Sequence, residues 1–196
     1  MQKSLFESSW ELTSPNETLD EIKNEMLQKA KLIPPLANEV FVFSQGEPNA
    51  EIAVVGESPG PPDAESEKPF QGPSGDLLNR ILSAIGLNRQ NAYLTNIVKI
   101  ISQGDELTPE IIKFFTPFVW RELNVVKPKV VLLLGNTPTK ALLNTKQPIS
   151  KVRGEFHEVD GLMFMPTFNP AYLLRDPTKK REVWEDVKQV KEFLKK

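Results

Sequence analysis

The chain has 196 residues, 39% of them hydrophobic, and its 24 basic and 26 acidic side chains give a formal net charge of −2. This size suits one domain, residues 1–196, and the near balance of charge neither requires nor excludes a nucleic-acid partner. There is no cysteine and one histidine, His157, which excludes disulfides, thiolate metal sites and cysteine nucleophiles and makes zinc or a histidine-dependent triad a poor fit.

The chain is expected to begin with a flexible segment, about residues 1–14, followed by a helix over about 15–31 that starts at a capping box, Ser14–Glu17. The N-terminal segment lacks the apolar core of a signal peptide, and no apolar run approaches the ~20 residues of a membrane span. We therefore expect a cytoplasmic protein without a membrane anchor, and we expect it to be a monomer. Residues 34–46 are expected to be irregular.

Four short apolar runs have the length of strands, at residues 51–56, 92–98, 129–135 and 162–168. Most of them lack alternation, which is typical of strands covered on both faces. Helical patterns lie between and after these runs, at residues 74–87, 108–123, 137–143 and 179–196. Strands that alternate with helices predict an α/β domain, a three-layer sandwich with a central, mainly parallel four-stranded sheet.

Several residues mark the expected ends of these elements. Ser74 is placed to cap the first helix after a strand, and Gly86 to end it. Thr108 is placed to cap the next helix, with Pro109 in its first turn. His157 falls in an expected hairpin or loop before the last strand, as a surface or structural residue rather than a catalyst.

Polar and turn-forming residues follow each predicted strand. They are the segments 57–60 and 135–137, Asn96 near the end of its run, and the segment 169–172. In an open parallel sheet, ligands bind at the carboxyl ends of the strands. The topology therefore predicts a pocket at this edge of the sheet.

The segment 56–75, GESPGPPDAESEKPFQGPSG, contains neither a Walker loop nor a GxGxxG fingerprint. By pattern alone it is as well explained by a Gly/Pro turn as by a binding loop. Phe70 in this segment is either a plug for the local core, which is the commoner role, or a stacking platform for a planar ligand.

Asn96 and the segment 169–175 also have two interpretations each. Asn96 lies in an apolar strand, so its amide belongs either to a structural hydrogen-bond network or to a site that reads a base edge. The segment NPAYLLR is either an ordinary turn followed by core residues, or an apolar wedge with a phosphate-binding arginine.

Taken in order, six segments resemble the motifs of the uracil-DNA glycosylase superfamily, above all those of its family 4. The segments are GESPG (56–60), PFQGPSG (69–75), LTNIVK (94–99), PKVVLLLG (128–135), RG (153–154) and PTFNPAYLLR (166–175). The resemblance extends from about residue 17 to the C-terminus with nearly constant spacing.

The resemblance implies roles for residues around a flipped base. The backbone at Glu57 and Ser58 would cradle the base, and Glu57 would shape the pocket. Phe70 would stack on the base. Asn96 would accept a hydrogen bond from N3 and donate one to O4, a pattern that cytosine does not offer.

The resemblance also implies catalytic and DNA-binding residues. Asp63, at a position that is usually Glu, would orient water or stabilise an oxocarbenium-like sugar, and Asn169 would support the departing base. The segment that enters the duplex would consist of Tyr172, Leu173, Leu174 and Arg175. The expected partner is DNA that contains uracil or another deaminated base.

Three departures separate this chain from the family pattern. Lys31, Pro34, Ile100 and Phe115 occupy the positions of the four iron–sulfur cysteines, so we expect no cluster and a site refilled mostly by apolar packing. Asn169 replaces the motif histidine, which is compatible with slower or altered activity. The loop 100–107 carries Asp105 and Glu106 near the expected DNA surface, where carboxylates repel phosphate.

The sequence thus predicts a metal-free DNA repair glycosylase that flips uracil or another deaminated base. One alternative is a catalytically degenerate relative that binds nucleic acid or a protein partner. A remoter one is an α/β domain that binds a free nucleobase or nucleotide.

Overall fold

The computed structural model describes residues 16–101 and 107–196. The expected flexible segment 1–14, with Ser14 of the predicted capping box, lies outside the described residues, as do Asp105 and Glu106. Within the described part of the chain, no helix is both long and apolar enough to cross a membrane.

The sheet has six strands in the order β1-β3-β2-β4-β6-β5. Their bounds are β1 Gln45–Gly46, β2 Ile52–Gly56, β3 Tyr93–Asn96, β4 Val130–Leu134, β5 His157–Val159 and β6 Leu162–Thr167. The four predicted strands are confirmed as β2, β3, β4 and β6, and they run parallel to one another. The predicted count of four is wrong, because β1 and β5 add antiparallel edges.

The two edge strands are too short to leave a sequence pattern, with two and three residues. β5 joins β6 in the expected hairpin, whose turn at Asp160 and Gly161 has positive φ angles of 49° and 77°. His157 lies in β5, half-buried, with Nε2 3.3 Å from the Val152 carbonyl oxygen. This placement agrees with a structural histidine.

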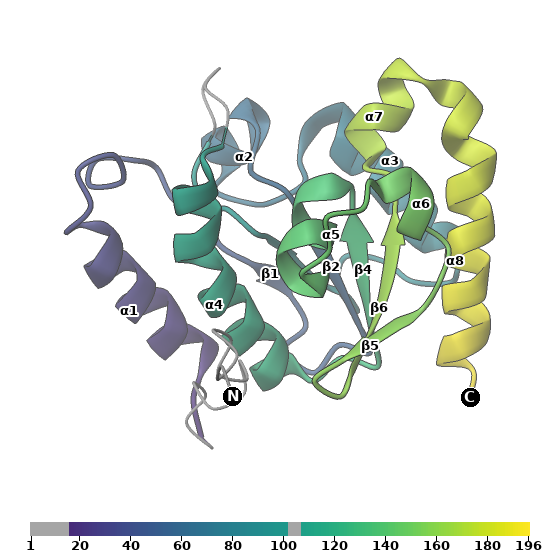
Figure 1. Ribbon diagram of the computed structural model, residues 1–196, viewed down its shortest axis with the longest axis horizontal. Helices are drawn as coiled ribbons and strands as arrows, with labels where there is room; N and C mark the ends of the chain where they lie inside the picture. Colours follow the sequence, from purple (N-terminus) through teal and green to yellow (C-terminus); the bar gives the residue numbers. More distant parts are fainter. Residues whose placement is uncertain (1–15, 102–106) are drawn as a thin grey trace.

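Helices cover both faces of the sheet (Figure 1). Their bounds are α1 Leu19–Ala30, α2 Pro61–Ser66, α3 Gly72–Ala84, α4 Pro109–Val126, α5 Asn136–Leu143, α6 Ile149–Val152, α7 Pro170–Arg175 and α8 Lys180–Leu194, with a 3₁₀ turn at Pro177–Lys179. One core contains residues of α1, α4 and α5, and the other contains residues of α3, α6, α7 and α8.

Strand β2 shows why the apolar runs do not alternate. Ala53 and Val55 belong to the core under α1, α4 and α5, whereas Ile52 and Val54 belong to the core under α3 and α8. All four side chains are buried, because helices lie on both sides of the strand.

The helix ends confirm some predicted caps and correct others. Gly86, with φ of 85°, follows α3, and the Thr108 hydroxyl accepts a hydrogen bond from the Ile111 amide, 3.3 Å away. α1 begins at Leu19, later than predicted, because the capping box is formed by Thr18 and Glu21. Ser74 does not cap α3: the helix begins two residues earlier, at Gly72, so Ser74 lies in its first turn.

Ion pairs between Arg121 of α4 and two glutamates hold α1 against α4. Arg121 Nη2 lies 2.5 Å from Glu25 Oε2, and its Nε donates to Glu17 Oε2 at 3.0 Å. The Arg121 guanidinium, assisted by Lys29, lowers the pKa of Glu25 to about 2. A carboxylate whose pKa is lowered in this way stabilises the fold at pH values above its ordinary pKa. This contribution is lost as the pH falls from about 4.5 toward 2.

We therefore expect Glu25→Gln to lower the free energy of unfolding by up to about 1 kcal/mol at pH 7, since the pair is partly solvent-screened. The difference between variant and wild type should shrink as the pH falls from 4.5 to 2, as measured by chemical denaturation. Glu158→Gln, an exposed change on β5, is the control and should show no such trend. A difference that stays constant over this pH range would contradict the assignment.

Candidate functional site

The carboxyl ends of β2, β3, β4 and β6 meet at one edge of the sheet, the upper edge in Figure 1, where α7 lies. The described side chains that follow these strands do come together there. The Thr137 hydroxyl at the start of α5 donates to Glu57 Oε2, and a Cβ placed on Gly135 would lie 3.3 Å from the Asn169 Cβ. The predicted convergence of strand ends is thus confirmed, and the pocket predicted at this edge stays a prediction.

Gly56, Asn96 and Phe70 form the centre of this edge. Gly56 pairs with Asn96 in the parallel register of β2 and β3. A Cβ on Gly56 would collide with Asn96 Oδ1 and lie 2.9 Å from the Phe70 ring. The absence of a side chain at Gly56 therefore lets the amide and the ring approach the same backbone.

Asn96 is almost wholly buried, but its amide is not closed off from solvent or a ligand. The residue is 3% exposed, its side chain forms no hydrogen bond to residues 16–101 or 107–196, and the one fully buried side-chain atom without a partner in those residues is the Tyr93 hydroxyl. Buried amides normally find partners within the protein or in bound water or ligand. The structural-network interpretation of Asn96 therefore has no hydrogen bond to support it within the described residues.

The loop that carries Phe70 has an unusual backbone. Phe70 has φ of 58°, a left-handed conformation that costs a non-glycine residue about 1–3 kcal/mol. Its ring is partly buried and packs against the core under α3. The ring is therefore both a side wall of the candidate site and an extension of the core.

Asp63 ties this loop to α2. The acidic segment after Gly60 is not a loop throughout, because Pro61 and Pro62 begin α2 and Asp63 is its third residue. Asp63 is 6% exposed, its Oδ2 accepts from the Gly60 amide at 3.1 Å, and its Oδ1 accepts from the Gln71 amide at 2.6 Å. Both carboxylate oxygens thus hold the backbone on either side of the site.

Glu57 and Ser58 lie at the exposed rim of the site. Glu57 is exposed and Ser58 is half-buried. The Glu57 carbonyl accepts from the Val98 amide at 2.9 Å, so the backbone pairing of β2 with β3 continues beyond the ends of both strands. The Glu57 carboxylate is held toward α5 by Thr137.

Asn169 is the N-cap of α7. Its Oδ1 accepts from the Ala171 amide at 2.8 Å, and its Nδ2 donates to the Leu134 carbonyl at 3.4 Å. An amide nitrogen carries two protons, so one remains for a ligand. The Asn-Pro turn predicted here is the beginning of a short helix.

The four predicted DNA-contacting residues of α7 fall into two groups. Leu173 is buried in the core, so it is not available as a wedge, which corrects that part of the prediction. The Tyr172 ring packs 5.3 Å from that of Phe168, and its hydroxyl donates to Asp176 Oδ2 at 3.3 Å. Leu174 is 47% exposed and Arg175 is exposed.

A buried ion pair supports the end of β3. Lys99 is fully buried, and its Nζ donates to the Asn96 carbonyl and to Glu122 Oε2, both at 2.9 Å. Burial lowers the pKa of Lys99, and the Glu122 carboxylate opposes this shift. This lysine was not among the predicted site residues, although a charge directly after an apolar run was a signal that it has a buried partner.

A second buried pair supports the end of β6 and explains the RG pair. Arg153 Nε donates to Asp186 Oδ2 at 3.0 Å, and the Thr167 hydroxyl donates to the same oxygen at 2.5 Å. Burial raises the pKa of Asp186, against the effect of these two hydrogen bonds. Asp186 thus joins α8 to Thr167, two positions before Asn169.

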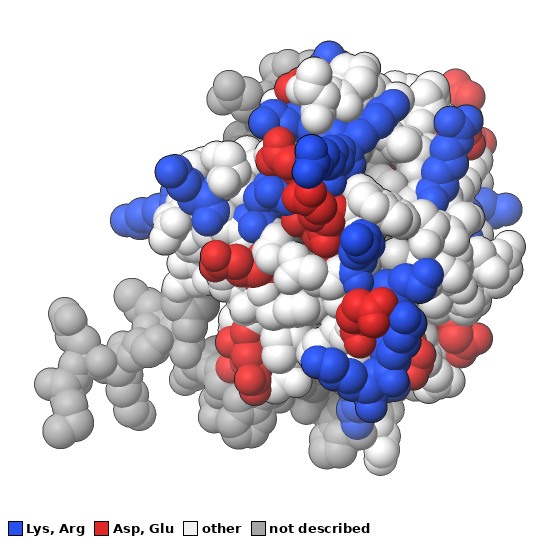
Figure 2. Space-filling view, turned by 90° about the vertical axis from the view of Figure 1, so that its right-hand side faces the viewer, with Lys and Arg blue, Asp and Glu red and all other residues white. Residues whose placement is uncertain are grey.

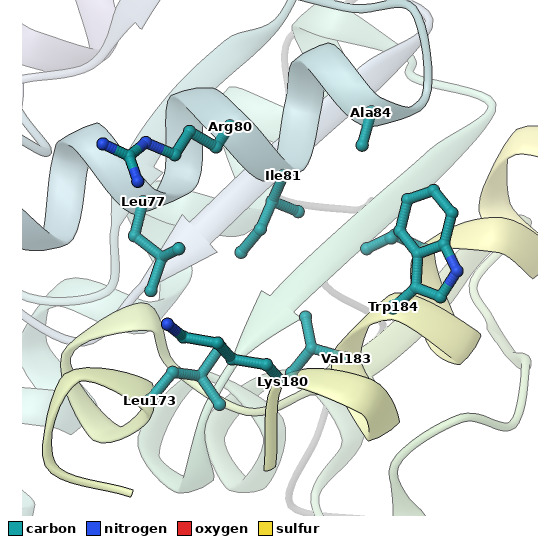
Figure 3. A pocket seen from close by; sticks show the side chains of 9 residues that line it. Leu77, Arg80, Ile81, Ala84, Leu173, Lys180, Val183 and Trp184 are labelled. Carbon is teal, nitrogen blue, oxygen red and sulfur yellow. The ribbon is translucent and has the colours of Figure 1, made fainter. Parts of the chain in front are cut away.

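An apolar hollow of about 160 Å³ lies between α3 and α8 (Figure 3). Its lining includes Leu77, Ile81, Leu173, Val183 and Trp184, with Arg80 and Lys180 at its sides. Leu173 is the one predicted site residue in this lining, so the hollow is separate from the candidate site.

On the face that carries α8, basic and acidic side chains are interspersed (Figure 2).

The residues present do not fit an iron–sulfur cluster. The chain has no cysteine, and the described residues contain no group of three histidine, aspartate or glutamate side chains that could hold a metal. Ile100 and Phe115 are buried, and the Phe115 ring lies 4.9 Å from that of Phe114. Lys31 and Pro34 are exposed, so the expected apolar refilling holds for two of the four positions.

Comparison with known proteins gives a family match and several relatives. Residues 43–188 match the model of the Uracil DNA glycosylase superfamily. The type-4 uracil-DNA glycosylase of Thermotoga maritima is 33% identical over 186 residues, which cover 92% of this chain and 97% of the relative. That of Saccharolobus solfataricus is 34% identical over 191 residues, covering 91% and 87%.

Proposed function

Because the chain belongs to the uracil-DNA glycosylase superfamily, we propose that it hydrolyses the N-glycosidic bond of uracil, or of another deaminated base, in DNA. The observation that carries this proposal is the meeting of the unpartnered Asn96 amide and the Phe70 ring over Gly56. The chain would act as a monomer, since all the groups needed come from one copy.

Base recognition would use the two groups that meet over Gly56. A flipped uracil would stack on Phe70 and present its Watson–Crick edge to Asn96. The amide oxygen would accept from N3–H, and the amide nitrogen would donate to O4. Cytosine offers an acceptor at N3 and a donor at N4, so it would leave both amide atoms without a partner, which is a strong basis for rejection.

Catalysis would rest on fixed charges around the breaking bond. Cleavage leaves positive charge on the sugar and negative charge on the base, and water then supplies a hydroxyl to C1′ and a proton to the base. Asp63, fixed by two backbone amides, and Glu57, at the rim, would stabilise the cationic sugar and orient the water. The remaining Nδ2 proton of Asn169 would stabilise the departing base.

DNA contact would come from the exposed end of α7. Leu174 would fill the gap that the flipped base leaves in the duplex, and Arg175 would bind a phosphate. Tyr172 and Leu173 would act from within, by holding α7 to the core.

The direct test uses oligonucleotides with one uracil, in single- and double-stranded form, incubated with the purified chain and then treated with alkali. We expect strand breaks at the uracil and none at cytosine or thymine in the same position. If neither the chain nor its Asn169→His variant produces abasic sites at high enzyme excess, the enzyme proposal fails.

Asn169→His is expected to raise the single-turnover rate of excision by about tenfold or more. The reason is that one well-placed donor is worth about 10²–10³ in rate, and the Asn169 amide is divided between the α7 cap and the leaving base. Losing the cap should cost about 1 kcal/mol of stability. Asn169→Ala, which loses both cap and donor, is the control, and a rate equal to that of Asn169→His would contradict the argument.

The same hydrogen bonds of Asn169 favour a second candidate function, a degenerate glycosylase fold that binds nucleic acid or a protein without cleaving DNA. This candidate predicts salt-sensitive binding of oligonucleotides with no abasic sites, because phosphate contacts release counterions. Binding of free uracil without affinity for oligonucleotides would instead indicate a nucleobase-binding domain.

A further inference from the structure

We propose that Arg89, in the loop between α3 and β3, is a positioning residue for base recognition, which holds the Phe70 ring where the base stacks. This role rests on the proposed function and extends that function by identifying what holds the stacking residue in place. Arg89 would not touch the base; it would act through the backbone of Pro69 and Phe70.

The contacts of Arg89 point to this role. Its Nη2 donates to the Pro69 carbonyl at 2.6 Å, and its Nη1 donates to the Phe70 carbonyl at 2.9 Å. The rigid, planar guanidinium thus holds two successive carbonyl groups at once, which a lysine ammonium does not reproduce.

The guanidinium is itself fixed by the scaffold. Nη2 also donates to Gln45 Oε1 of β1 at 3.1 Å, and Nη1 to Asn79 Oδ1 of α3 at 3.4 Å. Arg89 is half-buried, and burial lowers its pKa while the charge of Asp63 opposes the shift. Through Arg89, the Phe70 loop is thereby anchored to a strand and a helix, and precise sites need support of this kind.

The conformation that Arg89 holds is one the loop does not adopt freely. Phe70 has positive φ, and its carbonyl faces Gly75, where any Cβ would collide with it. On the other side, Asp63 holds the Gln71 amide at 2.6 Å. Without Arg89, the Phe70 carbonyl would lose its donor, and the Pro69 carbonyl would keep only the Gln71 Nε2 donor at 3.0 Å. The left-handed Phe70 would thus lose one of its restraints.

The test compares Arg89→Ala and Arg89→Lys with Arg80→Ala, an exposed arginine of α3, as the matched control. We expect Arg89→Ala to lower kcat/KM for uracil excision by about 10–100-fold, mainly through KM, with Arg89→Lys giving little rescue and Arg80→Ala close to wild type.

A double-mutant cycle separates positioning from plain stability. If Arg89 acts through Phe70, then Arg89→Ala in a Phe70→Ala background should change KM by less than twofold, because the two losses are not additive. A second loss as large as the first would overturn the proposal and leave Arg89 a merely structural residue.

A third measurement does not need activity. Amide hydrogen exchange at Gln71 should be at least about tenfold faster in Arg89→Ala than in wild type, relative to the core amide of Leu132. Unchanged exchange at Gln71 overturns the positioning role even if the enzyme is active. Faster exchange in a protein that cleaves no uracil supports loop positioning and places the failure in the proposed function instead.

Discussion

Replacing Asn96 with alanine is expected to lower the rate of uracil excision by about 10²–10³-fold, while the free energy of unfolding stays within about 1 kcal/mol of wild type. The amide is the one group over Gly56 that reads the base edge in the proposed mechanism. It forms no hydrogen bond within the described residues, so the fold loses none when it is removed.

Thr95→Val is the matched control, one residue earlier in the same strand. The Thr95 hydroxyl donates to Glu122 Oε2 at 2.8 Å beside buried Lys99. This variant should therefore lose about 1–3 kcal/mol of stability and keep its excision rate within about tenfold. Single-turnover kinetics and chemical denaturation of both variants give the comparison. An Asn96→Ala protein that excises uracil at the wild-type rate contradicts the recognition role.

Replacing Gly56 with alanine is expected to lower excision by about 10²-fold or more and to cost about 1–3 kcal/mol of stability. The added methyl group would collide with Asn96 Oδ1 and lie 2.9 Å from the Phe70 ring, so both groups must move from the position where they meet. Gly56 also lies in the middle of the sheet, paired with Asn96, where the backbone has little freedom to shift.

Gly60→Ala is the control within the same GESPG motif. A Cβ on Gly60 would meet only the Pro62 Cδ, at an ordinary contact of 3.8 Å, and its φ of −99° suits any residue. This variant should keep both activity and stability, the latter within about 1 kcal/mol. Equal losses of activity and stability in Gly56→Ala and Gly60→Ala would show that the motif tolerates a side chain at neither glycine. The contacts of Gly56 with Asn96 and Phe70 would then not be the cause.

The sequence alone was sufficient for the central strands and for the edge at which the site lies. Four apolar runs without alternation, with helical patterns between them, indicate a parallel sheet covered on both faces, and the carboxyl ends of such strands lie at one edge. The order of the motifs from Gly56 to Arg175 was likewise sufficient for the family. These properties are periodic or local, so they can be read from neighbouring residues.

Only the tertiary structure decided which side chains are free to act. Leu173 and Leu174 are neighbours of the same type, and the packing of α7 against α3 and the core beside it buries one and exposes the other. Asp63 and Arg89 lie 26 positions apart in polar segments without periodicity, and they become part of one site because both bind the backbone around Phe70. Long-range hydrogen bonds to backbone leave no pattern in a sequence, because any residue supplies the carbonyl and nearly any supplies the amide.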